Sequence, residues 1–84
     1  MAKPQDRVDE LKRPPHSLEA EQAVIGGLML ENQAWDQVTA LVSEPDFYSP
    51  PHRVLFRSLA ELARRDRPFD VVTVIEMLKS MTSL

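Results

Sequence analysis

Prolines divide this chain into short segments, and their spacing constrains the fold more than any other feature. The chain has 84 residues, with seven prolines and only two glycines. Proline fixes φ and lacks an amide hydrogen, so it begins or ends helices but disrupts their interiors. Pro14-Pro15, Pro45, Pro50-Pro51 and Pro68 therefore mark boundaries. The segments between them have room for short helices only.

Apolar residues recur at helical spacing within these segments. The sequence predicts a first helix that begins at Ser17, a good N-cap, and continues through the apolar run at residues 23–30. Gly26-Gly27 lies inside this helix, where each glycine costs about 1 kcal/mol relative to alanine. Close approach of another helix would explain the two glycines, and an early end of the helix is the alternative.

Three further helices are predicted. The second spans about residues 32–42 with Asn32 as its cap, and the third begins at Ser49-Pro50-Pro51. The fourth begins after Asp70. Residues 71–75 are β-branched throughout and could form a strand by propensity, but the helical spacing and the Asp cap favour a helix. Four short amphipathic helices predict an all-α fold, a compact orthogonal bundle.

The predicted domain covers residues 16–84, and its core should be small because the chain is short. Residues 1–15 have little apolar content and no helical period, which predicts a flexible N-terminal arm; a regulatory or partner-binding arm is the alternative.

The expected core collects the large apolar residues of the helical stripes, with Trp35 as an anchor. These are Leu18, Val24, Ile25, Leu28, Trp35, Val38, Leu41, Phe47, Leu55, Phe56, Leu59, Leu62, Val71, Val74, Ile75 and Leu78.

Charge and composition narrow the classes of function. The formal net charge is −3. The first fifteen residues hold four basic and three acidic side chains, so the remainder carries a net charge of −4, which argues against a primary nucleic-acid-binding surface. The absence of cysteine excludes disulfides and thiolate metal sites. No apolar run approaches the length of a membrane span or a signal peptide, so a cytoplasmic location is expected.

Motifs that carry chemistry are not found in the sequence. It contains no phosphate-binding glycine-rich loop, and His16 and His52 belong to no clustered ligand set. We therefore expect no catalytic, cofactor-binding or metal-binding residue. His52 lies on the apolar side of its helix, which favours a buried structural imidazole. The cluster Arg64-Arg65-Asp66-Arg67 is interpreted as a solvated loop, with a phosphate-binding patch as the alternative.

Recognition of other proteins is the remaining class of function. Aromatic and arginine side chains near loops are the types enriched in binding hot spots, although an ordinary surface or core role is the alternative for each. The candidates for a protein interface are Tyr48, Arg53, Arg57, Arg64, Arg67 and Phe69.

Three strings of residues carry a resemblance to a known family. They are residues 17–27 (SLEAEQAVIGG), residues 46–56 (DFYSPPHRVLF) and residues 68–74 (PFDVVTV). In this order and spacing they resemble the N-terminal domain of the bacterial replicative DNA helicases of the DnaB family. The resemblance covers about residues 14–78.

The resemblance implies a hexameric helicase that unwinds the parental duplex 5′ to 3′ at the replication fork, in the cytoplasm and at the nucleoid. ATP and Mg would bind a separate RecA-like domain that also contacts DNA, so no catalytic residue is carried over to this chain. The family's N-terminal domains pair as dimers, form a collar on the hexamer and dock DnaG-type primase. Helicase loaders and phage replication proteins are further implied partners.

The resemblance also implies a truncation, because the family's helical hairpin, linker and ATPase domain would follow the part seen here. The chain thus resembles the globular head of the N-terminal domain. The alternative is a helical interaction domain of another replication protein, such as the helicase-binding end of a primase.

Overall fold

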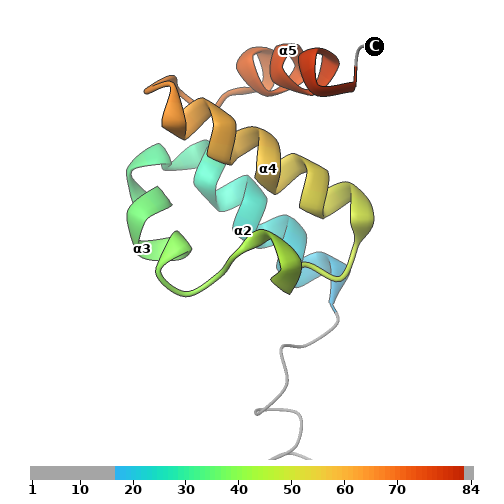
Figure 1. The fold of residues 1–84 in the computed structure, drawn as a ribbon. Helices are drawn as coiled ribbons and strands as arrows, with labels where there is room; N and C mark the ends of the chain where they lie inside the picture. Colours follow the sequence, from blue (N-terminus) through green and yellow to red (C-terminus); the bar gives the residue numbers. More distant parts are fainter. Residues whose placement is uncertain (1–16, 83–84) are drawn as a thin grey trace, which may run out of the picture.

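Helix α4 lies at the centre of the fold, between α2 on one side and α5 on the other (Figure 1). The computed structural model describes residues 17–82, so the predicted arm at residues 1–15 lies outside the described residues. The elements, in chain order, are α2 (Leu18–Leu30), the 3-10 turn η1 (Asn32–Ala34), α3 (Trp35–Thr39), the 3-10 turn η2 (Glu44–Asp46), α4 (Pro50–Arg64) and α5 (Val71–Thr82). The predicted all-α fold is confirmed, and residues 17–82 contain no strand.

Three of the four predicted helix starts are confirmed by side-chain caps. The Ser17 Oγ accepts a hydrogen bond from the Ala20 amide at 3.1 Å, and the Ser49 Oγ accepts one from the His52 amide at 3.5 Å. At the start of α5 the Asp70 Oδ1 accepts a bond from the Thr73 amide at 2.8 Å. These bonds satisfy amides that have no partner inside their helices, which is why the β-branched run after Asp70 forms a helix and not a strand.

The predicted second helix is wrong in its extent. It is replaced by η1 and the short helix α3, which ends at Thr39. The Thr39 hydroxyl donates to the Trp35 carbonyl at 2.9 Å, a backbone bond typical of threonine that competes with helix continuation. Leu41, which the longer helix would have buried, is 85% exposed.

Asn32 has a different role from the one predicted. Its side chain does not cap η1. The amide nitrogen donates to the Leu28 carbonyl at 2.9 Å and to the Phe69 carbonyl at 3.2 Å, while Oδ1 accepts from the Phe69 amide at 2.8 Å. Asn32 thus joins the end of α2 to the loop that precedes α5.

The end of α4 is a Schellman motif with aspartate at the left-handed position. Asp66 has a φ of 57°, the one positive value among non-glycine residues of the described chain. The Asp66 amide donates to the Ala63 carbonyl at 3.0 Å, and the Arg67 amide donates to the Leu62 carbonyl at 2.9 Å. The reversal is completed by Pro68, which cannot continue a helix.

The core is built around three aromatic side chains on different elements. The ring centroids of Phe47 and Phe56 lie 4.9 Å apart, and those of Trp35 and Phe56 lie 5.2 Å apart. Such offset and tilted contacts are favourable between aromatic rings. The fully or nearly buried apolar residues are Ile25, Leu28, Phe47, Phe56, Leu59, Leu62, Phe69, Val74 and Met77.

The predicted core is correct for α4 and, apart from Leu18, for α2, but it is partly wrong for α5. Of the expected core residues, the exposed ones are Leu18, Leu41, Val71 and Ile75. Helix α5 is apolar on more than one stripe, so its pattern alone does not determine which face meets α4. The structure buries Val74 and Met77 against α4 and leaves Val71 and Ile75 outside.

Both predicted explanations of Gly26-Gly27 are wrong. Helix α2 continues through the pair to Leu30, so the helix does not end early. A Cβ built at either glycine meets no other atom within 4 Å, so no helix approaches closely there.

Gly26→Ala and Gly27→Ala should each stabilise the fold by about 0.5–1 kcal/mol, because alanine reduces the entropy of the unfolded chain and meets no clash. Urea unfolding followed by circular dichroism measures this gain. A loss of stability in either variant would contradict the open surroundings of these glycines.

Phe56→Ala should cost about 3–5 kcal/mol, because its ring contacts two other rings in the core and its removal leaves a cavity. Leu30→Ala is the matched control, since Leu30 is 93% exposed. Thermal unfolding of both variants checks the difference. A Phe56→Ala variant that melts within a few degrees of the wild type would refute the assignment.

Candidate protein-docking surface on helix α4

A carboxylate buried between α2 and α4 fixes the loop that leads into α4. The Glu21 side chain is 9% exposed. Its Oε2 accepts a hydrogen bond from the Tyr48 amide at 2.6 Å, and its Oε1 accepts one from the Ser49 amide at 3.2 Å. The His52 Nδ1 lies 2.7 Å from the same Oε1. One side chain of α2 therefore holds both the loop and the first turn of α4.

The Glu21 carboxyl is held in its ionised form by these contacts. Burial is the largest single influence and raises its pKa, but hydrogen bonds from His52 and from the Tyr48 and Ser49 amides lower it. The net effect is a pKa below the usual value. An ionised carboxylate only accepts hydrogen bonds, so the His52 Nδ1 must carry a proton. The negative charge also lies at the N-terminus of α4, where the helix dipole favours it.

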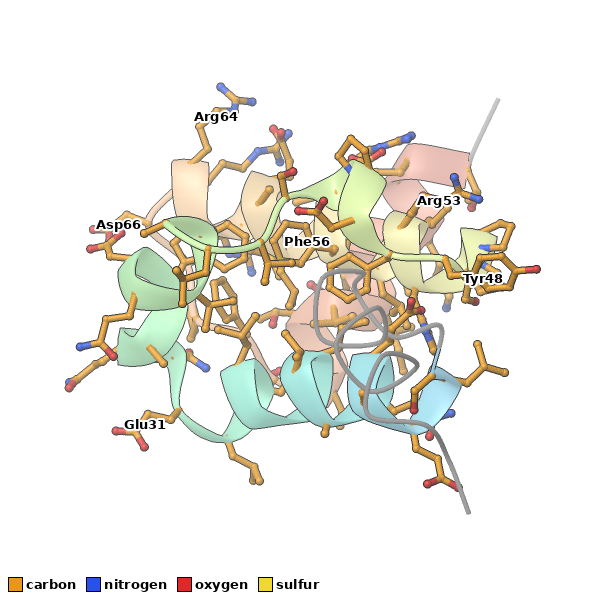
Figure 2. The ribbon with its side chains drawn as sticks, turned by 90° about the horizontal axis from the view of Figure 1, so that it is seen from below. Glu31, Tyr48, Arg53, Phe56, Arg64 and Asp66 are labelled. Carbon is orange, nitrogen blue, oxygen red and sulfur yellow. The ribbon has the colours of Figure 1, made fainter. Side chains whose placement is uncertain are left out.

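We call the contacts of Glu21 with the Tyr48 amide, the Ser49 amide and His52 the Glu21 anchor. This anchor leaves the Tyr48 side chain facing outward. Glu21 binds the Tyr48 amide and leaves its side chain 60% exposed. The Arg53 Nη2 donates to the Tyr48 carbonyl at 3.5 Å. Tyr48 and Arg53 lie together at one end of the molecule (Figure 2). The sequence candidates Tyr48 and Arg53 are therefore neighbours on a loop that is fixed from within.

Arg57 continues this surface one turn further along α4. Its Nε and Nη2 donate to the two carboxylate oxygens of Glu44, at 3.0 Å and 2.6 Å. This two-bond geometry is specific to the planar guanidinium and ties α4 to η2. The hydrogen bond from Arg57 is also the main reason why the pKa of Glu44 lies below its usual value.

Arg64 shares a helix face with Arg53 and Arg57, because the three follow i, i+4, i+11 spacing. We call these three residues the α4 arginine face. Arg64 forms an ion pair with Glu61, to which Arg65 also donates at 3.2 Å. Arg64 lies at the end of the molecule opposite Tyr48 (Figure 2). The ion pair between Arg64 and Glu61 favours the interpretation of residues 64–67 as a solvated loop over the alternative of a phosphate-binding patch.

Within residues 17–82, no group of three histidine or acidic side chains is arranged to hold a metal ion. No helix in the same range is long and apolar enough to cross a membrane.

Comparison with known proteins decides the family. The family model described as "DnaB-like helicase N terminal domain" matches residues 13–84. The chain belongs to this family. A protein of Buchnera aphidicola subsp. Schizaphis graminum named "Replicative DNA helicase DnaB" is 46% identical over 78 residues, or 93% of this chain. Proteins of the same name from Haemophilus influenzae and Leifsonia xyli are 48% identical over 80% of the chain and 36% identical over 95% of it.

The chain spans only a small part of these helicases. It covers 17% of the Buchnera and Leifsonia proteins and 14% of the Haemophilus protein. The family resemblance read from the sequence is thus confirmed for the DnaB N-terminal domain. The match also decides against the alternative of a primase domain.

Besides Arg64, two more sequence candidates lie away from the Tyr48 end of this DnaB-family domain. Arg67 is exposed and lies 4.0 Å from the Glu76 carboxylate of α5. Phe69 is buried, and its ring meets Trp35 edge-on with centroids 5.5 Å apart. In this structure Phe69 therefore belongs to the core and not to the surface, because the Asn32 bridge draws its backbone inward.

The Glu21 anchor was not found by sequence reasoning. In the sequence Glu21 stands out only as an acidic residue in the first turn of its helix, where the helix dipole favours negative charge. His52 on an apolar helix face was the available signal, because a buried imidazole requires a polar partner. The prediction that His52 is a buried structural imidazole is confirmed. Its partner lies 31 positions away in the sequence, so no local pattern identifies it.

Acid should remove the contribution of Glu21 to stability. Its folded-state pKa is lowered, so this contribution is complete above the unfolded-state pKa and disappears as the pH falls through the folded-state value. Glu21→Gln should therefore be less stable than the wild type at neutral pH and should converge with it in acid. Thermal unfolding from neutral to acidic pH measures both trends.

Glu19→Gln is the matched control, since Glu19 is an exposed carboxylate in the same first turn. It should lower the melting temperature much less than Glu21→Gln does at neutral pH. If the two variants have the same pH profile, the anchor does not act through its charge.

Proposed function

We propose that this chain is the globular head of a replicative helicase's N-terminal domain, and that it acts as a non-catalytic module for self-association and protein docking. The single observation that carries this proposal is the family match over residues 13–84, which covers the whole described fold. The related proteins are named replicative helicases, and this chain corresponds to about one sixth of their length.

The parent protein would supply the motor. We propose that it is a hexameric helicase that uses ATP and Mg in another domain to unwind DNA 5′ to 3′ in the bacterial cytoplasm. DNA would contact that other domain. The acidic balance of the present chain supports this division, because a surface that binds DNA needs basic residues to neutralise phosphates.

The docking role is supported by the Tyr48 end of the molecule. An exposed tyrosine beside two arginines has the composition of a binding hot spot. Glu21 fixes the Tyr48 backbone and Glu44 orients Arg57, so these side chains lose little freedom when a partner binds. DnaG-type primase is the proposed partner, with helicase loaders and phage replication proteins as others.

Tyr48→Ala and Arg57→Ala should each weaken binding of the primase C-terminal domain by about tenfold, because truncation of a hot-spot residue costs more than about 1 kcal/mol. Lys79→Ala on α5 is the control and should bind as the wild type does. Isothermal titration with primase from the source organism measures the affinity. Wild-type affinity in both test variants would show that primase docks elsewhere.

Self-association is tested separately by gel filtration with light scattering of the chain and of the parent helicase. A chain that stays monomeric at high concentration, and neither joins the parent ring nor binds primase, would contradict the proposed function.

A further inference from the structure

An open apolar hollow lies between α2 and α3, on a part of the molecule that contains none of the interface candidates. Its volume is about 440 Å³. We call it the α2–α3 hollow and define it by the residues at its base and sides, which include Ala23, Val24, Gly27, Leu28, Val38 and Leu41. Glu31 is the one charged residue in its lining.

The shape of the α2–α3 hollow suits a convex ridge of side chains. Ala23 and Gly27 leave the backbone of α2 thinly covered, and a Cβ built at Gly27 meets no other atom within 4 Å. Leu41 lines one side of the hollow and is 85% exposed. A surface that combines a hollow over small residues with a projecting leucine can bury the apolar face of an incoming helix.

The one charged residue that lines the hollow is acidic, and the stretch of sequence that contributes the lining carries no basic side chain. From Ser17 to His52 the chain contains no lysine or arginine. The acidic residues of this stretch are Glu19, Glu21, Glu31, Asp36, Glu44 and Asp46. Glu21 and Glu44 are engaged by His52 and Arg57, whereas Glu31 and Asp36 are exposed. Glu31 points outward from the molecule (Figure 2). A bound helix would therefore meet negative charge beside an apolar surface.

A second copy of this chain fits the hollow poorly. Its exposed large apolar residues on helices are Leu18 and Leu30 of α2 and Val71, Val72 and Ile75 of α5. The acidic residues Glu19, Glu31, Asp70 and Glu76 stand next to them in the sequence. Docking either helix into the hollow of another copy would bring these carboxylates toward its Glu31, and like charges at an interface disfavour the pairing.

We propose that the α2–α3 hollow binds an amphipathic helix of a partner protein, with an apolar ridge over Gly27 and lysine or arginine on its flanks. A basic flank meets Glu31, the charged residue that lines the hollow. This inference goes beyond the proposed function because it concerns a different face from Tyr48 and Arg57. It is independent of whether primase binds that end.

The direct probe is a synthetic peptide of about 18 residues, long enough to form a helix, with leucine and lysine at amphipathic spacing. A matched peptide carries glutamate in place of lysine. Methyl resonances of the protein report where each peptide binds. The lysine peptide should shift Val24, Leu28 and Val38 in the hollow and leave Val71 and Val72 of α5 unchanged. The glutamate peptide should bind at least about tenfold more weakly.

Gly27→Leu fills the hollow and should reduce binding of the lysine peptide by about tenfold or more. Gly26→Leu is the matched control, because Gly26 also has no atom within 4 Å of an added Cβ but does not line the hollow. It should bind the peptide as the wild type does. Circular dichroism confirms that both variants fold.

Several outcomes would overturn the inference. Shifts centred on α5, equal binding of both peptides, or undiminished binding to Gly27→Leu would each do so. Hollow resonances that move with protein concentration alone would identify a second copy as the occupant. Contacts of the hollow methyls with residues 1–16 in the absence of peptide would identify the chain's own N-terminal segment. Primase titrations remain the separate test of the proposed function.

Discussion

The structure depends on a buried charge that must be satisfied. Glu21 places a carboxylate between α2 and α4, where an unpartnered charge would be very costly. Two backbone amides and the His52 ring meet that requirement. Because those amides belong to the loop before α4, satisfying the charge also sets the position of that loop. Phe47 is thereby directed into the core, and Tyr48 is directed to solvent.

The same constraint links the fold to its proposed role. A docking surface is most effective when its side chains are held before the partner arrives. The Glu21 anchor provides this for Tyr48, and the two-bond contact of Arg57 with Glu44 provides it one turn away. The α2–α3 hollow differs in kind, since it is apolar and bordered by Glu31. The two proposed docking surfaces are thus chemically distinct.

The sequence predicted the helix starts well because their signals are local. Ser17, Ser49 and Asp70 each bond to an amide three residues away, so a short string contains both the donor and the acceptor. The end of the second helix was predicted poorly. No proline or glycine lies between Trp35 and Val42, and the hydroxyl of Thr39 gives only a weak stop signal. The family resemblance was recognisable because three separated strings kept their order.

By itself the sequence determined the all-α class, three of the four predicted caps and most of the core on α2 and α4, because helical period and capping act within a few residues. Only the tertiary structure decided which stripe of α5 is buried, where Asn32 directs its amide, and which partner His52 has. Those outcomes depend on contacts between residues 31 and 37 positions apart. Long-range contacts of this kind leave no periodic trace in the chain, since each arises from how already formed helices pack.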